Sequence, residues 1–453
     1  MANARSLVTA VATAAAFGAV TMLSLSGWTP ITLDAPNVST VVEPEAVTRN
    51  ILCSGSVLAA VTDSTSWTRV GTTSQGIAGG HLVNQFTTDS DPDGAIVTYD
   101  STPDAVAATE FASVNNDIVA GYMATECGDP VNSQWLVGGS TMTGRDAVLT
   151  ISNGSGVDAR VDLEFWGANG PINAPAASGL VIAAGTSKSY SLAGFAPAES
   201  SPVVHVISNG APVWATLQTS TVRGLVPGGL DRIASVGEPA TSIAVPIVRQ
   251  PDEAIIGPLR VDPDYSDTVT LVRLLVPGDT DGTANITVTP FDGSEPATVT
   301  TPLTAGKVLD IPVDELATGD FSITIESDVP LVASTRFSAY STKSKVTDMA
   351  WAPAVTAKLG PAMSYVPVDG STLSIVNPSD TAATVVVTTK GSPTTVSVGA
   401  RSSVALTVGR GALTVESDSP VVAGVVVETQ NGVATLRLPT EPLGARSVTV
   451  IAH

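Results

Sequence analysis

One acidic segment of the sequence has the residue types and the spacing of a metal site. Its candidate ligands are Asp89, Asp91, Asp93, the Ala95 carbonyl and, at the twelfth position, Asp100. Alternating carboxylates can converge on a hard cation, and the glycine at the sixth position permits the sharp turn of a calcium loop. The segment therefore predicts a calcium site. The alternative is an acidic turn between two strands, because Asp, Pro and Gly are common turn residues.

Residue patterns typical of catalysis are scarce in this sequence. The chain has three histidines, His81, His205 and His453, and His205 lies in an alternating strand pattern that indicates an inter-strand position. There is no Gly-x-Ser-x-Gly elbow, no His-Glu-x-x-His pair, no cysteine cluster and no glycine-rich phosphate loop. Paired carboxylates, as in glycosidases, are the remaining catalytic alternative. We predict that the protein is not an enzyme and uses no cofactor apart from the calcium of the acidic segment.

The two cysteines, Cys53 and Cys127, both fall in the first third of the chain. An isolated pair in an exported chain usually forms a disulfide, and two unpaired core thiols are the alternative. In the chain-entropy model, closing a loop of about 75 residues stabilises the folded region by about 4 kcal/mol. We predict the disulfide.

The chain begins with an N-terminal segment that has almost no charged residues. Its uncharged run includes Leu7, Phe17 and Leu25 and is long enough to cross a hydrocarbon core of ~30 Å. Arg5 precedes the run and Asp34 follows it, and this charge asymmetry exports the C-terminal part. We predict a single-pass anchor in the cell membrane, with the bulk of the chain extracytoplasmic. The alternative is a cleaved signal peptide, which releases a secreted protein.

Composition after this segment favours sheet over helix. Charged residues make up only 14% of the chain, Val and Thr are abundant, and there are 40 Gly and 31 Pro. Because β-branched residues pack well on a pleated surface and Gly and Pro mark turns, we expect many short strands. The net charge is −21 and the basic residues are scattered singly, so we predict no nucleic-acid partner.

Three stretches of the chain follow one template of strands and turns. Each opens with an apolar strand that ends in an Asn, Pro or Gly turn, and continues with an alternating strand and a Gly-led strand. In the last two copies the segments Glu326–Ala333 and Glu416–Ala423 both read Glu-Ser-Asp-x-Pro-x-Val-Ala. Short alternating strands at regular spacing predict sandwiches. The predicted fold is all-β, with an N-terminal transmembrane helix followed by tandem immunoglobulin-like β-sandwich modules.

The repeats also predict the domain boundaries. The region that holds both cysteines fits the template poorly, so we interpret it as a separate, disulfide-bearing β module. In chain order we predict an anchor or signal sequence at 1–33, a stalk at 34–48, the disulfide-bearing module at 49–140, and β-sandwich repeats at 141–240, 241–350 and 351–453.

Several short motifs carry a resemblance to a known family. They are Cys53-Ser-Gly, Trp135-Leu-Val-Gly-Gly, Gly144-Arg-Asp, Asn153-Gly, Val161-Asp-Leu-Glu-Phe-Trp-Gly and Pro202-Val-Val-His-Val. On these motifs the chain resembles an actinobacterial exported, membrane-anchored family known only as a domain of unknown function, family 5719. The resemblance implies an envelope location, an N-terminal anchor and repeated β modules, and it implies no catalytic residues.

These observations lead to one functional prediction and two alternatives. We predict a non-catalytic, membrane-tethered, extracytoplasmic protein that contacts envelope proteins or glycans, with an accessory role in envelope polysaccharide assembly. The first alternative is a calcium-assisted carbohydrate-binding or adhesion module that uses exposed aromatic residues such as Trp67, Trp166 and Trp214. The second alternative is a carboxylate-based hydrolase, which requires a cleft that gathers His81 or several carboxylates.

Overall fold

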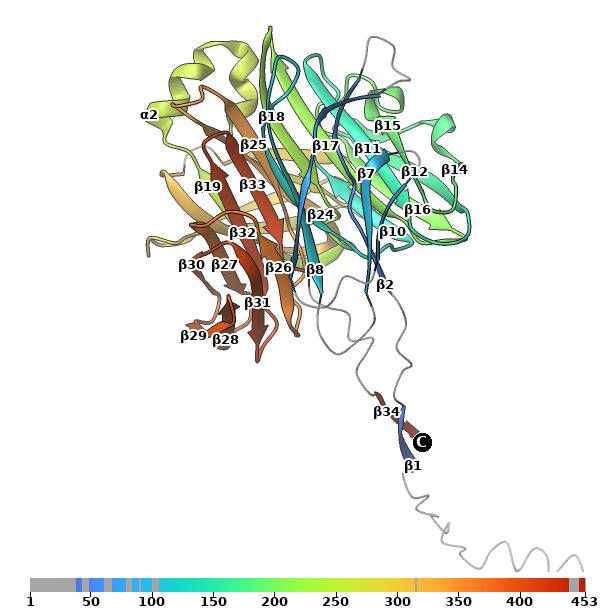
Figure 1. The fold of residues 1–453 in the computed structure, drawn as a ribbon. Coiled ribbons are helices and arrows are strands. Elements are labelled where there is room, and N and C mark those ends of the chain that lie inside the picture. The colour runs from blue at the N-terminus through green and yellow to red at the C-terminus, as the bar shows by residue number, and fades with distance from the viewer. Residues whose placement is uncertain are drawn as a thin grey trace, which may run out of the picture. The chain divides into compact units, whose positions relative to one another are not determined.

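The computed structural model describes most of the chain, and its fold is almost entirely β (Figure 1). The described residues are 38–42, 49–60, 67–78, 84–88, 91–99, 106–313, 316–439 and 448–452. The chain separates into two compact units, one formed by Met1–Glu45 with Ala445–His453 and the other by Ala46–Gly444. The predicted all-β class is confirmed.

The first unit is described as a two-stranded sheet. Strand β1 (Val38–Val42) pairs antiparallel with β34 (Val448–Ala452), so part of the predicted stalk lies beside the C-terminal strand. The predicted anchor, with Leu7, Phe17 and Leu25, lies outside the described residues. Within the described part of the chain, no helix combines the length and the apolar character needed to span a membrane.

The second unit begins with the N-terminal module (residues 49–127). Its sheets have the orders β2-β7-β6, β3-β4 and β5-β8-β9. The bounds are β2 (Arg49–Leu52), β3 (Val57–Ala60), β4 (Trp67–Gly71), β5 (Ser74–Ala78), β6 (Asn84–Thr88), β7 (Asp91–Tyr99), β8 (Ala107–Asn115) and β9 (Ala120–Cys127). The predicted disulfide is confirmed: the sulfurs of Cys53 and Cys127 are 1.97 Å apart, and the bond joins the end of β2 to the end of β9.

Three further groups of strands follow, which we name the first repeat (residues 133–233), the second repeat (240–353) and the third repeat (362–437). The first contains β10 (Ser133–Val137), β11 (Arg145–Asn153), β12 (Ala159–Gly167), β13 (Gly170–Ile172), β14 (Leu180–Ile182), β15 (Thr186–Ser191), β16 (Val203–Asn209), β17 (Trp214–Arg223) and β18 (Val226–Ile233). The second contains β19 (Ala240–Gln250), β20 (Leu271–Leu275), β21 (Gly282–Pro290), β22 (Ala297–Leu303), β23 (Val308–Pro312), β24 (Gly319–Tyr340) and β25 (Thr347–Pro353).

The third repeat contains β26 (Ala362–Val366), β27 (Ser371–Asn377), β28 (Ala383–Thr389), β29 (Ser392–Val398), β30 (Ser402–Val408), β31 (Gly411–Ser417), β32 (Val422–Thr429) and β33 (Gly432–Arg437). Helix is confined to short insertions in the described part of the chain. These are α2 (Glu253–Ile256) and the 3-10 segments Pro175–Ala177, Leu192–Gly194, Gly257–Val261 and Pro263–Thr268.

The three repeats share one strand connectivity. The third has the sheets β26-β31-β28-β29 and β30-β27-β32-β33, and the first matches them as β10-β16-β12-β13 and β15-β11-β17-β18. In the second repeat the long strand β24 serves both sheets, because its first half pairs with β19 and β21 and its second half with β20 and β25. Apolar side chains from both sheets of each repeat pack into one core. A β-sandwich-like architecture was predicted, and the structure has it.

The strand order nevertheless differs from that of an immunoglobulin domain. In the third repeat the first strand, β26, lies beside the sixth, β31, and the seventh, β32, lies beside the second, β27. Constant-type immunoglobulin domains place the first strand beside the second and the seventh beside the sixth. The chain therefore crosses between sheets after its sixth strand.

The repeated Ser-Asp-x-Pro motif marks this crossing. In the second repeat the motif is Ser327–Pro330, where the register of β24 shifts as the strand leaves one sheet for the other. In the third repeat it is Ser417–Pro420, at the junction of β31 and β32. Proline lacks a backbone N–H, so it is tolerated where a ladder is interrupted. The turn that the sequence indicated is thus a corner between two sheets.

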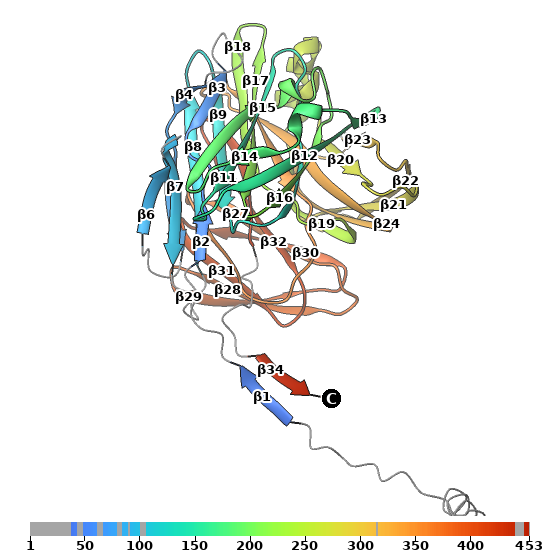
Figure 2. The same ribbon diagram turned by 90° about the vertical axis from the view of Figure 1, so that its right-hand side faces the viewer.

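The last strand of each module lies at the centre of the second unit. We call β9, β18, β25 and β33 the central strands; each ends its own sheet, and each contacts at least two of the others. Strands β18, β25 and β33 carry neighbouring labels in Figure 1, and β9 and β18 are labelled near each other in Figure 2. A free sheet edge leaves a row of unpaired backbone groups exposed. Here the four edges are buried against one another.

One buried carboxylate joins the four central strands. Asp348, at the start of β25, accepts hydrogen bonds of 2.8–2.9 Å from the backbone N–H groups of Tyr122 in β9, Leu230 in β18 and Val433 in β33. Burial raises the pKa of the Asp348 carboxyl well above its usual range, and these hydrogen bonds oppose the shift. A Cβ at Gly432 would collide with the carboxylate, so the lack of a side chain there leaves room for Asp348.

Candidate functional site

The predicted calcium ligands lie only partly within the described residues. Asp89 and Asp100 are outside them, whereas Asp91, Asp93 and Ala95 belong to strand β7. The register of β7 against β6 shifts within this stretch, so its backbone is an irregular strand where the motif predicts a loop. In the part of the chain that the structure describes, no group of three or more His, Cys, Asp or Glu side chains is arranged to hold a metal ion. The calcium site remains a prediction.

His205 lies in a row of side chains that crosses three strands; His81 and His453 are outside the described residues. The His205 ring stacks on Trp135 at 4.0 Å between centroids. Its Nδ1 is 3.1 Å from Glu164 Oε2, and its Nε2 is 3.0 Å from Ser133 Oγ. This order of serine, histidine and carboxylate is that of an acyl-transfer triad. Ser133, however, lies in strand β10, in regular pairing with β16, and not on an exposed turn.

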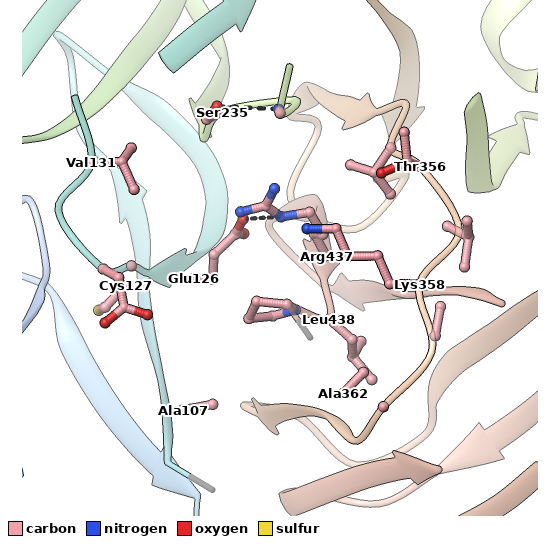
Figure 3. A pocket seen from close by; sticks show the side chains of 18 of the residues that line it. Ala107, Glu126, Cys127, Val131, Ser235, Thr356, Lys358, Ala362, Arg437 and Leu438 are labelled. Atoms are coloured by element: carbon pink, nitrogen blue, oxygen red, sulfur yellow. Dashed lines mark hydrogen bonds and ion pairs between the residues drawn. The ribbon is translucent and has the colours of Figure 1, made fainter. Parts of the chain in front are cut away.

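The strongest candidate for a binding site is a cavity of about 470 Å³, which we call the central cavity (Figure 3). It lies at the C-terminal ends of all four central strands. Residues that follow each of these strands line it: Gly128 after β9, Ser235 after β18, Val355 after β25 and Leu438 after β33. All four modules therefore contribute to its wall, and a volume of this size is in the range of ligand pockets.

An ion pair crosses the central cavity. Arg437 Nε donates to Glu126 Oε1 at 2.7 Å, and both side chains are largely buried. In Figure 3 the Arg437 guanidinium faces Glu126, and the Lys358 side chain extends toward the same space. Val131, Trp214 and Leu438 make part of the wall apolar. An apolar wall with a few convergent charges suits the binding of an amphipathic ligand, and no histidine lines this cavity among the described residues.

The predicted aromatic residues do not meet on one surface. Trp214 is 3% exposed and lines the central cavity. Trp166 packs against Trp135, with 5.2 Å between the centroids. Trp67 donates its indole N–H to the Ser189 carbonyl at 3.2 Å. Of these three tryptophans, Trp214 alone lines the central cavity. They do not form the row of exposed aromatic residues that a carbohydrate-binding or adhesion module would need.

The charged residues at the centre of the molecule were missed by motif reasoning. Asp348, Glu126 and Arg437 match no known motif, and each lies in a strand that is otherwise almost wholly buried. A signal was nevertheless present, since a charged residue within an apolar strand must be paired or hydrogen-bonded when it is buried. Segment 346–354, in which Asp348 is the one charged residue, shows that signal clearly.

Comparison with known proteins identifies a family but no activity. A family model described as "Family of unknown function (DUF5719)" matches residues 87–409, as the motif resemblance predicted. Curated proteins give no match. Among solved structures, Thermotoga maritima 1070 is 18% identical, with 26% of this chain and 93% of that chain covered and a TM-score of 0.22. The Anabaena sensory rhodopsin transducer is 22% identical, with 21% and 95% covered and a TM-score of 0.17.

Proposed function

We propose that this chain, which belongs to the DUF5719 family, is a non-catalytic, membrane-tethered protein of the cell envelope whose modules act as one rigid structural and interaction unit. In this proposal the N-terminal segment holds the chain in the membrane, and residues 46–444 lie outside the cytoplasm. An accessory role in the assembly of envelope polysaccharide is the context that we favour.

The observation that supports a structural role most strongly is the packing of the central strands around Asp348. A string of independent modules needs only linkers between neighbours. Here a single buried carboxylate accepts hydrogen bonds from the N-terminal module, the first repeat and the third repeat while belonging to the second. Displacing any one module would leave a buried donor or the carboxylate without its partner, which is costly.

Polar contacts also join each pair of neighbouring modules. They follow one another around the central strands: Arg232 with Glu110, Arg273 with the Gly139 carbonyl, Ser374 with the Pro246 carbonyl, and Arg437 with Glu126. The last of these contacts returns to the N-terminal module, so the set closes on itself. Such a closed set of interfaces favours a rigid body, which suits a scaffold that must hold several partners at fixed positions.

The tether rests on the sequence together with the pairing in the first unit. The uncharged run through Leu7, Phe17 and Leu25 is long enough for a membrane span. Strand β1 follows this run and pairs with β34, so the proposal places the C-terminal strand beside the stalk as well.

Crosslinking in cells tests the interaction role. A photo-reactive residue is placed singly at one exposed position in each repeat: Leu225 (95% exposed), Val299 (56% exposed) and Lys390 (side chain 65% exposed). The buried position Leu217 is the matched control. The proposal expects adducts with envelope proteins or glycans from at least one exposed site and none from Leu217. Exported protein that yields no such adduct from any of the three exposed sites would contradict it.

The carbohydrate-binding alternative draws support from Trp214 in the wall of the central cavity. Its indole nitrogen is buried and has no hydrogen-bond partner among the described residues. A wall-glycan array probed with the wild type and with Trp214→Phe separates the two functions. Binding that requires Trp214 favours the carbohydrate module, and the scaffold proposal expects no glycan signal that depends on this residue.

A serine hydrolase, which differs from the carboxylate-based hydrolase predicted from the sequence, would use Ser133, His205 and Glu164. A reactive serine in such a row would be labelled by a fluorophosphonate probe, and the label would be lost in Ser133→Ala. We expect no labelling of the wild type, because Ser133 lies within a paired strand. Labelling that disappears in Ser133→Ala would instead establish a nucleophile.

A further inference from the structure

A second cavity lies between the first and second repeats, away from the central cavity. It has a volume of about 400 Å³, and we call it the inter-repeat cavity. Gly139, Arg145 and Thr219 come from the first repeat, and Asp267, Asp310 and Arg336 come from the second. None of the sequence motifs for metals, phosphates or nucleophiles falls on it.

Three hydrogen-bonding groups on the wall of this cavity have no partner among the described residues. They are Thr219 Oγ1, Arg336 Nε and Trp351 Nε1. Thr219 is 2% exposed and Trp351 is 3% exposed, so bulk solvent does not satisfy them. An unsatisfied buried polar group costs about 1–3 kcal/mol, and folded proteins contain few of them. Three such groups on one cavity wall indicate that an acceptor-bearing molecule belongs there.

One guanidinium group on the cavity wall is available to an anion. Arg145 and Arg223 share one carboxylate, Asp267, at 3.0 and 2.9 Å, and Arg273 pairs with Asp310 at 2.8 Å. Arg336 makes no ion pair with any described residue; its Nη2 donates to the Val269 carbonyl at 3.3 Å. Of these four arginines, Arg145 and Arg336 line the cavity, together with the carboxylates of Asp146, Asp267 and Asp310. Among these four arginines, Arg336 is the one whose guanidinium has no carboxylate partner among the described residues, so its charge is available to an anion.

Arg336 keeps its charge in this environment. Burial, together with the neighbouring Arg273, lowers the pKa of Arg336 to about 10, while Asp267 and Asp310 oppose the shift. The guanidinium is therefore protonated at neutral pH. A planar guanidinium offers paired donors that match the geometry of a carboxylate or phosphate.

The remaining wall is rich in hydroxyl groups. Ser140, Thr143, Ser220, Thr221 and Ser266 all line the cavity. Hydroxyl groups both donate and accept, so a set of them suits a polyhydroxylated ligand better than an apolar one. Trp351 offers no free platform for stacking, because the Arg273 and Arg336 guanidinium groups lie over its ring at 4.7 and 5.7 Å. Recognition in this cavity would depend on hydrogen bonds and charge.

We propose that the inter-repeat cavity binds a small anionic saccharide, whose carboxylate or phosphate group lies against Arg336 and Thr219 and whose hydroxyl groups face the serines and threonines of the wall. This inference goes beyond the proposed function, because a rigid scaffold needs no small ligand. Two classes of ligand, a uronate and a sugar phosphate, have this chemistry, which is an anionic group on a hydroxylated ring.

Isothermal titration calorimetry on the full chain in detergent tests the proposal with four probes: D-glucuronate, glucose 6-phosphate, inorganic phosphate and glucose. We expect one of the two anionic sugars to bind at least tenfold more tightly than glucose and than inorganic phosphate. The sugar that binds identifies the source of the anion. Binding of inorganic phosphate as tight as that of the sugars, or no binding of either sugar, would overturn the proposal.

Variants locate the binding. Thr219→Val removes one hydroxyl while keeping the shape of the side chain, and Arg336→Gln removes the charge. Each is expected to weaken the binding of the anionic sugar at least tenfold. Arg401→Gln is the matched control, because Arg401 is exposed and pairs with Glu326 and Asp380 on the surface. If Arg336→Gln fails to fold, Thr219→Val alone decides, and unchanged binding in that variant rules the inter-repeat cavity out.

Discussion

Asp348 and Arg336 are both ionisable groups at junctions between modules, yet their surroundings differ. The Asp348 carboxylate accepts three backbone N–H groups from three other modules. The Arg336 guanidinium donates to one carbonyl, and its Nε has no partner among the described residues. Asp348 is thus part of the internal hydrogen-bonding of the fold, whereas Arg336 lies on the wall of a cavity with hydrogen-bonding capacity to spare.

The difference separates a group that holds the molecule together from a group available to a ligand. Removing a buried ionisable group whose hydrogen bonding is complete is strongly destabilising, because its partners are left unsatisfied. A buried charge with incomplete hydrogen bonding costs free energy in the empty protein and gains its partner only on binding. Stability measurements on the two sites should therefore give opposite results.

Removing the Asp348 carboxylate is expected to have the largest effect. Asp348→Ala leaves the N–H groups of Tyr122, Leu230 and Val433 buried without an acceptor, and each such group costs about 1–3 kcal/mol. We expect the free energy of unfolding to fall by about 4 kcal/mol or more in urea titrations. The control is Asp369→Ala, whose carboxylate is 72% exposed, so this variant should lower the free energy of unfolding much less. Equal effects for the two variants would show that Asp348 does not stabilise the packing of the central strands.

The disulfide is expected to come next. Replacing Cys53 and Cys127 together by Ala should lower the free energy of unfolding by about 4 kcal/mol, since the bond closes a loop with a sequence separation of 74 residues. The N-terminal module should nevertheless stay joined to the repeats, because Glu110, which is fully buried, still pairs with Arg232. Limited proteolysis checks this point: early release of residues 49–127 from the variant would show that the covalent bond, and not the buried contacts, holds the module.

A second buried aspartate gives a pH-dependent effect. Burial raises the pKa of Asp231 from 3.8 to about 7, although the Trp351 N–H donates to its carboxylate. Because this pKa is higher in the folded state than in the unfolded chain, the folded protein binds the extra proton between these values. The contribution of Asp231 to stability is therefore present below about pH 4 and is lost as the pH rises through about 7.

Comparing the wild type with Asp231→Asn isolates this contribution. The difference between their urea midpoints should change between about pH 4 and about pH 8, with the wild type losing more stability over this interval. A difference that stays constant with pH would show that Asp231 is ionised throughout.

Removing the Arg336 charge is expected to have the smallest effect, and a different sign. Arg336→Met keeps the length of the side chain and removes a buried cation that makes no ion pair with any described residue. We expect the ligand-free protein to lose no stability and to gain up to about 1 kcal/mol. Thermal unfolding of the wild type and of Arg336→Met in ligand-free buffer measures this change in stability. A loss as large as that of Asp348→Ala would mean that Arg336 is part of the structural centre too.

The sequence predicted the repeating parts of the fold well. The strands that contain Leu149, Leu271 and Leu373, and the segments that follow them, occupy equivalent places in the three repeats. Alternation of apolar and polar residues reports which face of a strand is buried, and glycine and proline report where strands end. The disulfide was predicted from the isolated cysteine pair, and the family from its short motifs.

The packing of the repeats against one another could not be predicted from the same signals. Local periodicity reports that a strand edge is buried and not what covers it, so nothing in the neighbourhood of Asp348 pointed to Tyr122 or Val433. These residues are separated from Asp348 by more than eighty positions in the chain. The inter-repeat cavity was hidden for the same reason, because Thr219 and Arg336 are ordinary strand residues until two repeats meet.

The central claim, that residues 46–444 behave as one interlocked body, is tested most directly by differential scanning calorimetry. The account predicts a single cooperative transition whose calorimetric and van't Hoff enthalpies agree, because no module can leave without exposing the central strands. Two or more resolved transitions, or a van't Hoff enthalpy well below the calorimetric one, would mean that the modules unfold independently, and this would contradict the account.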